Sequence, residues 1–146
     1  ANFLKVSTDP AKTFVAGLSM GGYGALKLAL NFPDRYAAAA SLSGAVDMAT
    51  LMQREDRKDE IGGRVFGGAL DASEDLHGLL AGSAAPPLWI GCGTEDLLIE
   101  HNRRFVDAAR EAGLTVTTDF SPGEHEWGLW DAQLPAVLDY FAVHLP

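Results

Sequence analysis

Short apolar runs and longer stretches with helical spacing alternate along this chain. Four runs are typical of buried strands, at 13–17, 36–43, 87–92 and 114–120. Helices are predicted over 20–31 and 99–112. A last helix carries apolar residues at helical spacing that we expect in the core, namely Trp130, Leu134, Val137, Leu138 and Phe141. Strands that alternate with helices predict an α/β fold, in which helices cover a parallel sheet.

The stretch from 44 to 86 interrupts this alternation. Helix-like pieces at 48–57 and 73–80 are separated by several glycines. Two interpretations are open: an excursion over 45–86 that partly caps a site, or an ordinary long connection. No repeat or linker divides the chain, so one domain is expected over 1–146. If the four strands pair in chain order, the first has an exposed edge unless something covers it.

The charge balance narrows the classes of partner. The chain has 20 acidic and 11 basic residues, for a formal net charge of −9. An acidic surface repels nucleic-acid phosphates and anionic lipid heads, so neither nucleic acid nor a membrane is an expected partner. No apolar run reaches the roughly 20 residues that a membrane-spanning helix needs. The single cysteine, Cys92, lies in an apolar run and is expected to be a buried, unreactive thiol.

Residues 17–21, Gly-Leu-Ser-Met-Gly, match the pattern G-x-S-x-G. They join a predicted strand to a predicted helix, a setting typical of a nucleophile elbow, the sharp turn that presents a reactive serine. Side chains at 17 and 21 are expected to clash there, and Gly22 and Gly24 to let the helix approach the sheet. Ser19 would be the nucleophile and the Met20 N–H an oxyanion-hole donor. The alternative is that Ser19 only caps the helix.

A serine nucleophile needs a histidine that accepts its proton and a carboxylate that orients the histidine. Residues 93–96, Gly-Thr-Glu-Asp, follow the third predicted strand, at the sheet edge where α/β proteins place their sites. Glu95 and Asp96 are both candidates for the acid, and either could instead serve as charge at a helix N-terminus. His125 is the histidine that lies in a loop after a strand; the others are expected to be structural or exposed, namely His77, His101 and His144.

These residues predict ester hydrolysis through an acyl-enzyme on Ser19, with a small-molecule ester as substrate. No metal or cofactor is expected, because the sequence has no H-E-x-x-H, P-loop or dinucleotide-binding pattern. Two alternatives remain open. A thioesterase or acyltransferase would use the same three residues, and a non-catalytic fragment or binding module would keep the fold without turnover.

Four segments together resemble the esterase D family of α/β-hydrolases, which includes S-formylglutathione hydrolase and feruloyl or acetyl esterases: 17–25, 41–44, 93–96 and 123–127. Their spacing is most similar to that of bacterial tributyrin-type carboxylesterases. The resemblance covers nearly the whole chain and implies a serine carboxylesterase for short- or medium-chain acyl esters. It also implies a catalytic triad of Ser19 as nucleophile, Asp96 as acid and His125 as base.

The same resemblance implies residues that touch the substrate. Ser43 and Gly44 would line the site beside the elbow. Trp127 and Trp130 would border the acyl or alcohol pocket, although both could equally be core aromatics. These four positions are therefore the expected substrate-binding residues.

The chain departs from the family on its N-terminal side. Family members have a longer N-terminal part, which carries the first half of the sheet and the loop with the second oxyanion donor. We therefore expect the chain to be the C-terminal portion of the fold, with about four parallel strands. The missing part or an oligomer partner would cover the first-strand edge. Loss of one oxyanion donor costs about 10²–10³ in kcat, so the isolated chain is expected to be weakly active or inactive. A cytoplasmic location is expected.

Overall fold

The computed structural model describes residues 5–146, in which four parallel strands pair in chain order. The strands are β1 (Phe14–Leu18), β2 (Ala38–Leu42), β3 (Leu88–Gly93) and β4 (Val116–Ser121). The helices are α1 (Met20–Asn31), α2 (Met48–Met52), α3 (Ile99–Glu111) and α4 (Trp127–Ala142). Short 3₁₀ turns lie at Pro10–Lys12 and Pro33–Arg35, and a π-helix spans Lys58–Val65. The predicted strands and principal helices are all present, with ends that differ by one or two residues.

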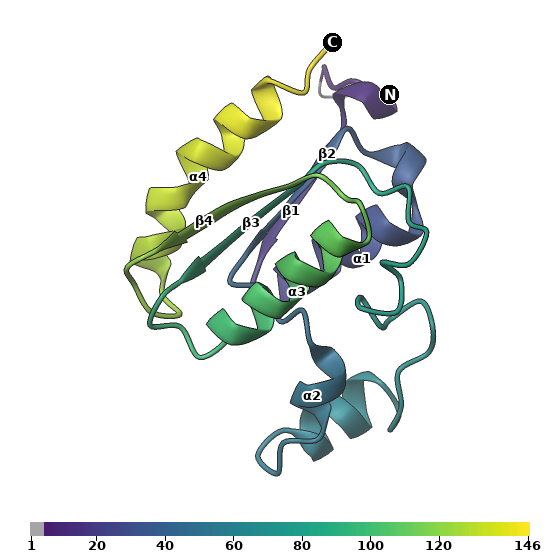
Figure 1. Ribbon diagram of the computed structural model, residues 1–146, viewed down its shortest axis with the longest axis vertical. Helices are drawn as coiled ribbons and strands as arrows, with labels where there is room; N and C mark the ends of the chain where they lie inside the picture. Colours follow the sequence, from purple (N-terminus) through teal and green to yellow (C-terminus); the bar gives the residue numbers. More distant parts are fainter. Residues whose placement is uncertain (1–4) are drawn as a thin grey trace.

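Helices cover both faces of the sheet (Figure 1). α1 and α3 lie on one face and α4 lies on the other. β2 and β3 are buried along their whole length because they have a strand on each side and a helix layer on each face. This arrangement agrees with the predicted α/β fold, in which the helices shield a parallel sheet from water.

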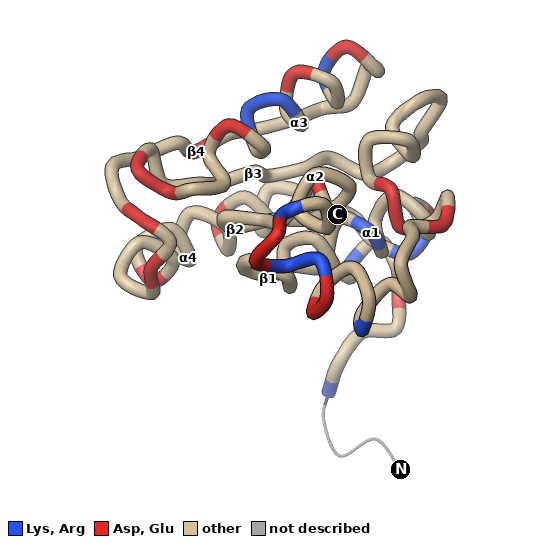
Figure 2. The backbone as a smooth tube through the Cα atoms, turned by 90° about the horizontal axis from the view of Figure 1, so that it is seen from below, with Lys and Arg blue, Asp and Glu red and all other residues tan. Residues whose placement is uncertain are grey.

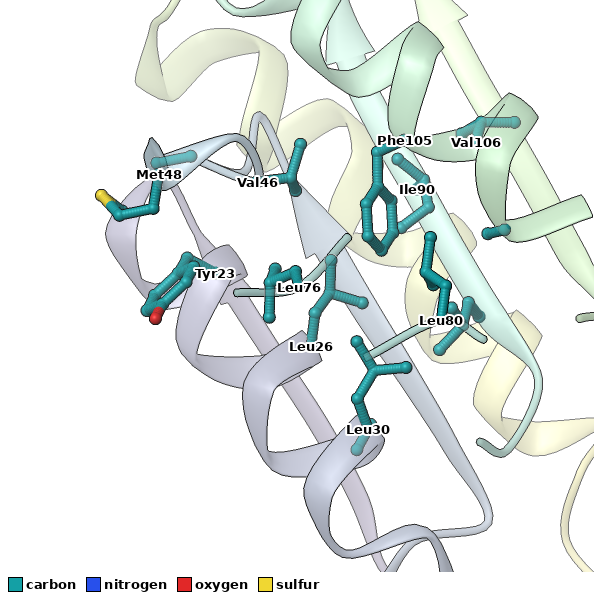
Figure 3. Close-up of a cluster of buried hydrophobic side chains, with 14 of the residues drawn as sticks. Tyr23, Leu26, Leu30, Val46, Met48, Leu76, Leu80, Ile90, Phe105 and Val106 are labelled. Carbon is teal, nitrogen blue, oxygen red and sulfur yellow. The ribbon is translucent and has the colours of Figure 1, made fainter. Parts of the chain in front are cut away.

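Two hydrophobic clusters fill the space between sheet and helices. The larger lies on the α1 and α3 face, where Leu26, Phe105 and Ile90 are completely buried. Leu76 and Leu80, from the long segment between β2 and β3, pack among them (Figure 3). The smaller cluster joins Trp89 of β3 to Trp130 and Val137 of α4. Burial of apolar surface contributes roughly 25 cal/mol for each Å², so both clusters stabilise the packing of the helices on the sheet.

The prediction that the whole apolar stripe of α4 lies in the core was wrong in part. Trp130 and Val137 are buried, whereas Leu134 and Leu138 are 47% and 59% exposed. α4 contacts β2 and β3, and its apolar residues extend round more of the helix than these two strands can cover. The stripe predicted the helix correctly but overstated how much of it would be buried.

The segment from 45 to 86 is less helical than its sequence indicated. The predicted helix over 48–57 ends at Met52, and the π-helix follows after a turn. The predicted helical piece at 73–80 is a series of turns. There the Asp71 carboxylate accepts hydrogen bonds from both the backbone N–H and the hydroxyl of Ser73, which favours a turn over a helix.

Two points along this segment are tied to the helices. Asp47 caps α2 by accepting a hydrogen bond from the Thr50 N–H, and its other oxygen lies 3.2 Å from the Arg104 guanidinium of α3. Burial alone would raise the pKa of Asp47, but the hydrogen bonds from Thr50 and Arg104 outweigh it and lower that pKa. Further along the segment, the Tyr23 hydroxyl donates to the Glu74 carbonyl over 2.8 Å. The segment is therefore anchored to both α1 and α3.

The two outer strands of the sheet, β1 and β4, differ in how far their outer edges are hydrogen-bonded. Within residues 5–146 no strand pairs with the outer edge of β1, whose Ala16 is exposed. On β4, the outward-facing Val116 carbonyl accepts a hydrogen bond from the Arg110 guanidinium. A side chain thus satisfies one acceptor of the β4 edge, while the outer edge of β1 is open. In the described part of the chain, no helix is both long and apolar enough to cross a membrane.

Candidate active site

The candidate triad lies where β1, β3 and β4 end. Ser19 follows β1 directly, Asp96 lies in the turn after β3, and His125 lies in the loop between β4 and α4. Because the strands are parallel, their carboxyl ends all lie at the same end of the sheet. Residues far apart in sequence can therefore meet there. Ser19 and His125 are 106 positions apart along the chain.

A strained turn presents Ser19 between strand and helix. Its φ of 54° and ψ of −119° lie in a region that non-glycine residues rarely occupy. The turn is held by the sheet: the Ser19 N–H donates to the Leu42 carbonyl over 2.9 Å, and the Ala45 N–H donates to the Ser19 carbonyl over 3.1 Å. The conformation is that of a nucleophile elbow, because the side chain projects from the end of the sheet.

Two of the four elbow glycines are required by contacts. A Cβ at Gly17 would overlap the backbone of Gly21, and one at Gly22 would lie 2.5 Å from Ser41 Oγ and 2.9 Å from Gly44 Cα. The predictions for Gly21 and Gly24 were wrong, because a Cβ at either would meet no atom within 4 Å. Only the side of α1 that faces the sheet is crowded, and these two glycines face away from it.

The three side chains form a continuous hydrogen-bonded series. His125 Nδ1 lies 2.8 Å from Asp96 Oδ2, and His125 Nε2 lies 2.9 Å from Ser19 Oγ. In the tautomer with its proton on Nδ1, the imidazole donates to the carboxylate and accepts the serine hydroxyl proton. The Asp96 side chain is fully buried, and its second oxygen accepts a hydrogen bond from the Leu98 N–H. The carboxylate is thus fixed and aimed at the imidazole.

Glu95, the other candidate for the acid, forms hydrogen bonds with the loop that contains His125. Its Oε2 accepts a 2.6 Å hydrogen bond from the Gly123 N–H, and its own N–H donates to the Gly123 carbonyl. The Thr94 hydroxyl also donates to this carboxylate. The hydrogen bond from Gly123, followed by that from Thr94, lowers the pKa of Glu95. Glu95 therefore ties the loop of His125 to the turn of Asp96, and the structure brings Asp96 alone to the imidazole.

Ser43 and Trp130 form a hydrogen-bonded pair beside the imidazole of His125. Ser43 has no exposed surface, and its hydroxyl accepts a hydrogen bond from Trp130 Nε1 over 3.1 Å. The Trp130 ring stands edge-on to the His125 imidazole, with centroids 5.0 Å apart. Both side chains are buried and neither lines the cavity beside Ser19, so their contact with a substrate stays a prediction.

Gly44 and Trp127 also lie outside the cavity at the triad. The buried Gly44 accepts a hydrogen bond from the Asn102 amide through its carbonyl. Trp127 is 67% exposed and packs edge-on against Trp130. Neither of them lines the cavity that Ser19 opens into.

That cavity has a volume of about 200 Å³. It is lined by the triad members Ser19 and His125, by Met20, and by residues that the sequence did not single out, namely Ala45, Leu51, Arg54, Arg57, Ile61, Leu97 and Leu98. Five of those seven belong to the segment 45–86, which therefore forms a wall of the cavity. Leu97 and Leu98 could have been suspected from the sequence because they adjoin Asp96.

His77, His101 and Cys92 are not among the residues that line this cavity. His77 packs edge-on against Phe105, and burial lowers the pKa of His101. Burial raises the pKa of Cys92 to about 12, as expected for an unreactive thiol. A larger cavity of about 610 Å³ lies between α2, the π-helix and residues 68–75, and no triad residue lines it. Among residues 5–146, no group of three or more His, Cys, Asp or Glu side chains is arranged to hold a metal ion.

Comparison with known proteins agrees with the geometry. Residues 4–141 match the family described as "Putative esterase", and the chain belongs to that family. It is 26% identical over 145 residues to an acetyl esterase of Caldicellulosiruptor saccharolyticus, a match that covers 90% of this chain and 54% of the relative.

Solved structures of α/β-hydrolase enzymes share the fold. An S-formylglutathione hydrolase (FrmB) of Staphylococcus aureus superposes with a TM-score of 0.81 at 28% identity, over 95% of this chain and 57% of that one. FphF, a fluorophosphonate-binding serine hydrolase of the same organism, gives a TM-score of 0.82 at 27% identity, over 94% and 57%. The chain thus spans just over half the length of these relatives, and the predicted α/β-hydrolase fold and family resemblance are confirmed.

Proposed function

We propose that this protein is a serine carboxylesterase that hydrolyses short- or medium-chain acyl esters. The observation that carries the proposal is the unbroken hydrogen-bonded series from Asp96 through His125 to Ser19, at the mouth of a cavity. Each member has the partner that its role requires, and the family and its relatives are esterases or serine hydrolases. Geometry and family therefore support the same chemistry.

The proposed reaction has two halves. Ser19 Oγ attacks the ester carbonyl carbon while His125 Nε2 takes its proton, and the imidazolium is stabilised by Asp96. The tetrahedral intermediate collapses, the C–O bond to the alcohol breaks, and the alcohol leaves with the proton from His125. Water then attacks the acyl-enzyme, losing a proton to His125, and the acid is released as Ser19 regains its hydrogen.

Met20 supports the charged intermediate through its backbone. It is the first residue of α1, where N–H groups have no acceptor within the helix and the helix dipole is positive. An oxyanion formed at Ser19 would receive a hydrogen bond from this N–H. We propose Met20 as one donor of the oxyanion hole.

The cavity supports the proposed acyl range. Most of its lining is apolar, from Met20, Ala45, Leu51, Ile61, Leu97 and Leu98. A space of about 200 Å³ suits a short or medium acyl chain and is smaller than the roughly 300–1,000 Å³ typical of sites for drug-sized ligands.

Covalent labelling tests the proposal directly. A fluorophosphonate probe reacts with an activated serine and needs no turnover, so we expect slow but measurable labelling that Ser19→Ala abolishes. Ser73→Ala, which changes an exposed serine outside the cavity, is the matched control and should label normally. Absence of labelling in the wild-type protein, or labelling that survives Ser19→Ala, would reject the esterase assignment in favour of a non-catalytic module.

A thioesterase is the second candidate, favoured by the likeness to an S-formylglutathione hydrolase at 28% identity. The same triad would attack a thioester carbonyl and expel a thiol. The kcat/KM for an oxygen ester and for its sulfur analogue with the same acyl group would separate the two. Transfer of the acyl group to an added alcohol would identify an acyltransferase instead.

We also propose that the protein is cytoplasmic, and fractionation of cells would test this location.

A further inference from the structure

The charged side chains that line the cavity beside Ser19 are arginines, although the chain as a whole is acidic. Arg54 and Arg57 line it together with His125, and no aspartate or glutamate is among its lining residues. The remaining lining is apolar apart from the nucleophile. The chain carries a formal net charge of −9, so the charged side chains in this lining are opposite in sign to the net charge of the chain.

Both arginines come from one stretch of the segment 45–86. They lie between α2 and the π-helix, where basic and acidic residues alternate along the backbone (Figure 2). Arg54 and Arg57 line the cavity, whereas Glu55 and Asp56 between them do not. Basic groups beside apolar walls concentrate their field in a cleft and attract anions.

The existing partners of these arginines leave them able to bind a ligand. Arg54 donates two hydrogen bonds to Asp56, and the two side chains are 47% and 57% exposed. Arg57 approaches Asp56 and Glu60 only to 3.8 Å and 3.6 Å, beyond hydrogen-bond length. Exposed ion pairs contribute little to stability, so a ligand carboxylate can compete for guanidinium groups that carry five N–H donors each.

We infer that Arg54 and Arg57 select esters that also carry a carboxylate group. The inference rests on the proposed function and names its substrate class. The apolar lining would hold the hydrocarbon part of the ester, and the two guanidinium groups would bind the carboxylate in the bidentate manner that arginine favours. A small dicarboxylic monoester fits this description on the acyl side, and an ester of a carboxyphenol fits it on the alcohol side.

Two matched substrate pairs test the inference and separate the sources of the carboxylate. On the acyl side, 4-nitrophenyl glutarate monoester is compared with the neutral 4-nitrophenyl valerate. On the alcohol side, 4-carboxyphenyl butyrate is compared with 4-carbamoylphenyl butyrate. The readout is the ratio of kcat/KM for the anionic substrate to that for its neutral partner. We expect the double variant Arg54→Gln/Arg57→Gln to lower this ratio at least about fivefold for one pair, chiefly through KM.

Arg103→Gln is the matched control. It removes the same charge from a side chain that is 47% exposed, paired with Glu100 on α3 and outside the cavity. We expect it to leave the ratio unchanged, and about 0.5 M salt to lower the wild-type ratio. Equal ratios in the wild type and the double variant, or an equal fall in Arg103→Gln, would overturn the inference.

Binding without turnover distinguishes failure of the inference from failure of the proposed function. In a Ser19→Ala background, monomethyl glutarate and methyl valerate are titrated by NMR with and without the two arginine substitutions. We expect the anionic ligand alone to lose at least about fivefold in affinity. Absence of hydrolysis and labelling would reject the esterase, whereas equal binding of monomethyl glutarate to both proteins would reject the role of the arginines.

Discussion

Two neighbouring carboxylates, Glu95 and Asp96, have different partners in the structure. The fully buried Asp96 reaches the imidazole of His125, whereas the exposed Glu95 holds the backbone of Gly123. One orients the proposed base and the other holds the loop from which the base projects. Substitution of each residue by its amide removes the charge with little change in shape. The contributions of the two carboxylates to catalysis can therefore be compared.

The first residue-scale prediction concerns Asp96→Asn. An asparagine at this position no longer stabilises the imidazolium and favours the wrong tautomer of His125, so kcat should fall by about 10⁴. Steady-state kinetics on a neutral ester would measure it, with Asp107→Asn on the exposed side of α3 as the control. A loss smaller than tenfold would mean that Asp96 is not the orienting acid.

The second concerns Glu95→Gln, which weakens the hydrogen bond from Gly123 while leaving the triad intact. We expect kcat/KM to fall by only about threefold to tenfold, because the loop of His125 is held less firmly. The pKa of Glu95 lies below its ordinary value of 4.5, so its carboxylate stabilises the folded state fully above that value. The contribution is lost as the pH falls from 4.5 through the lower folded-state pKa.

Urea unfolding at two pH values checks the sign of this effect. At neutral pH the wild type should unfold at a higher urea concentration than Glu95→Gln, and the difference should shrink at about pH 3. A difference that grows on acidification would show that Glu95 does not act through its ionised form.

The sequence was informative about residues wherever a motif constrains the backbone. The motif and chain order predicted that Ser19 and His125 would meet a carboxylate from the turn after β3, and the family resemblance implied Asp96. The structure brings these three side chains together. Arg54 and Arg57 carry no such signal, because their place in the cavity depends on the path of a segment without regular periodicity. The hydrogen bond between Ser43 and Trp130 could not be predicted either, because the two residues are 87 positions apart and no motif joins them.

At the scale of elements, α1 packs against the end of β2 so closely at Gly22 that there is no room for a side chain. We predict that Gly22→Ala destabilises the protein by about 1–3 kcal/mol, because the added Cβ would lie 2.5 Å from Ser41 Oγ and 2.9 Å from Gly44 Cα. Gly24→Ala in the same helix is the control. Its Cβ would meet nothing within 4 Å, so it should be neutral or stabilise by up to about 1 kcal/mol. Denaturant unfolding that gave both variants the same effect would contradict the close packing.

The elements that the sequence predicted well are those with strong periodicity. Apolar runs bounded by turns located all four strands, and helical spacing located α1, α3 and α4. The segment 45–86 was harder because its local signals conflict. The Asp71–Ser73 turn and several glycines interrupt spacing that otherwise indicates helix, and tertiary contacts of Leu76 and Leu80 fix its path instead.

At the scale of the whole molecule, the open edge of β1 is the main feature that the described residues leave unpaired. Unpaired strand edges favour association with another strand. We propose that a further part of the polypeptide or a second copy of this chain covers this edge in the working protein. The relatives, whose length the chain spans only in part, support the first of these sources.

The edge predicts measurable self-association of the 146-residue chain. Sedimentation velocity should show the average mass rising with concentration, and Ala16→Lys should reduce the rise because a charge on an edge strand opposes pairing. Ala136→Lys on an exposed position of α4 makes the same chemical change away from β1 and should have no effect. A monomer at every concentration would contradict this prediction.

The wide separation of the triad along the chain has a consequence for a nicked form of the protein. A single cut after the exposed Arg57 would leave Ser19 on one peptide and Asp96 with His125 on the other. The backbone pairing of β2 with β3, from Ala39 opposite Leu88 to Leu42 opposite Gly91, would still join the halves. The nicked protein should therefore keep its reactive serine until denaturant separates the two peptides, so loss of fluorophosphonate labelling would report their dissociation.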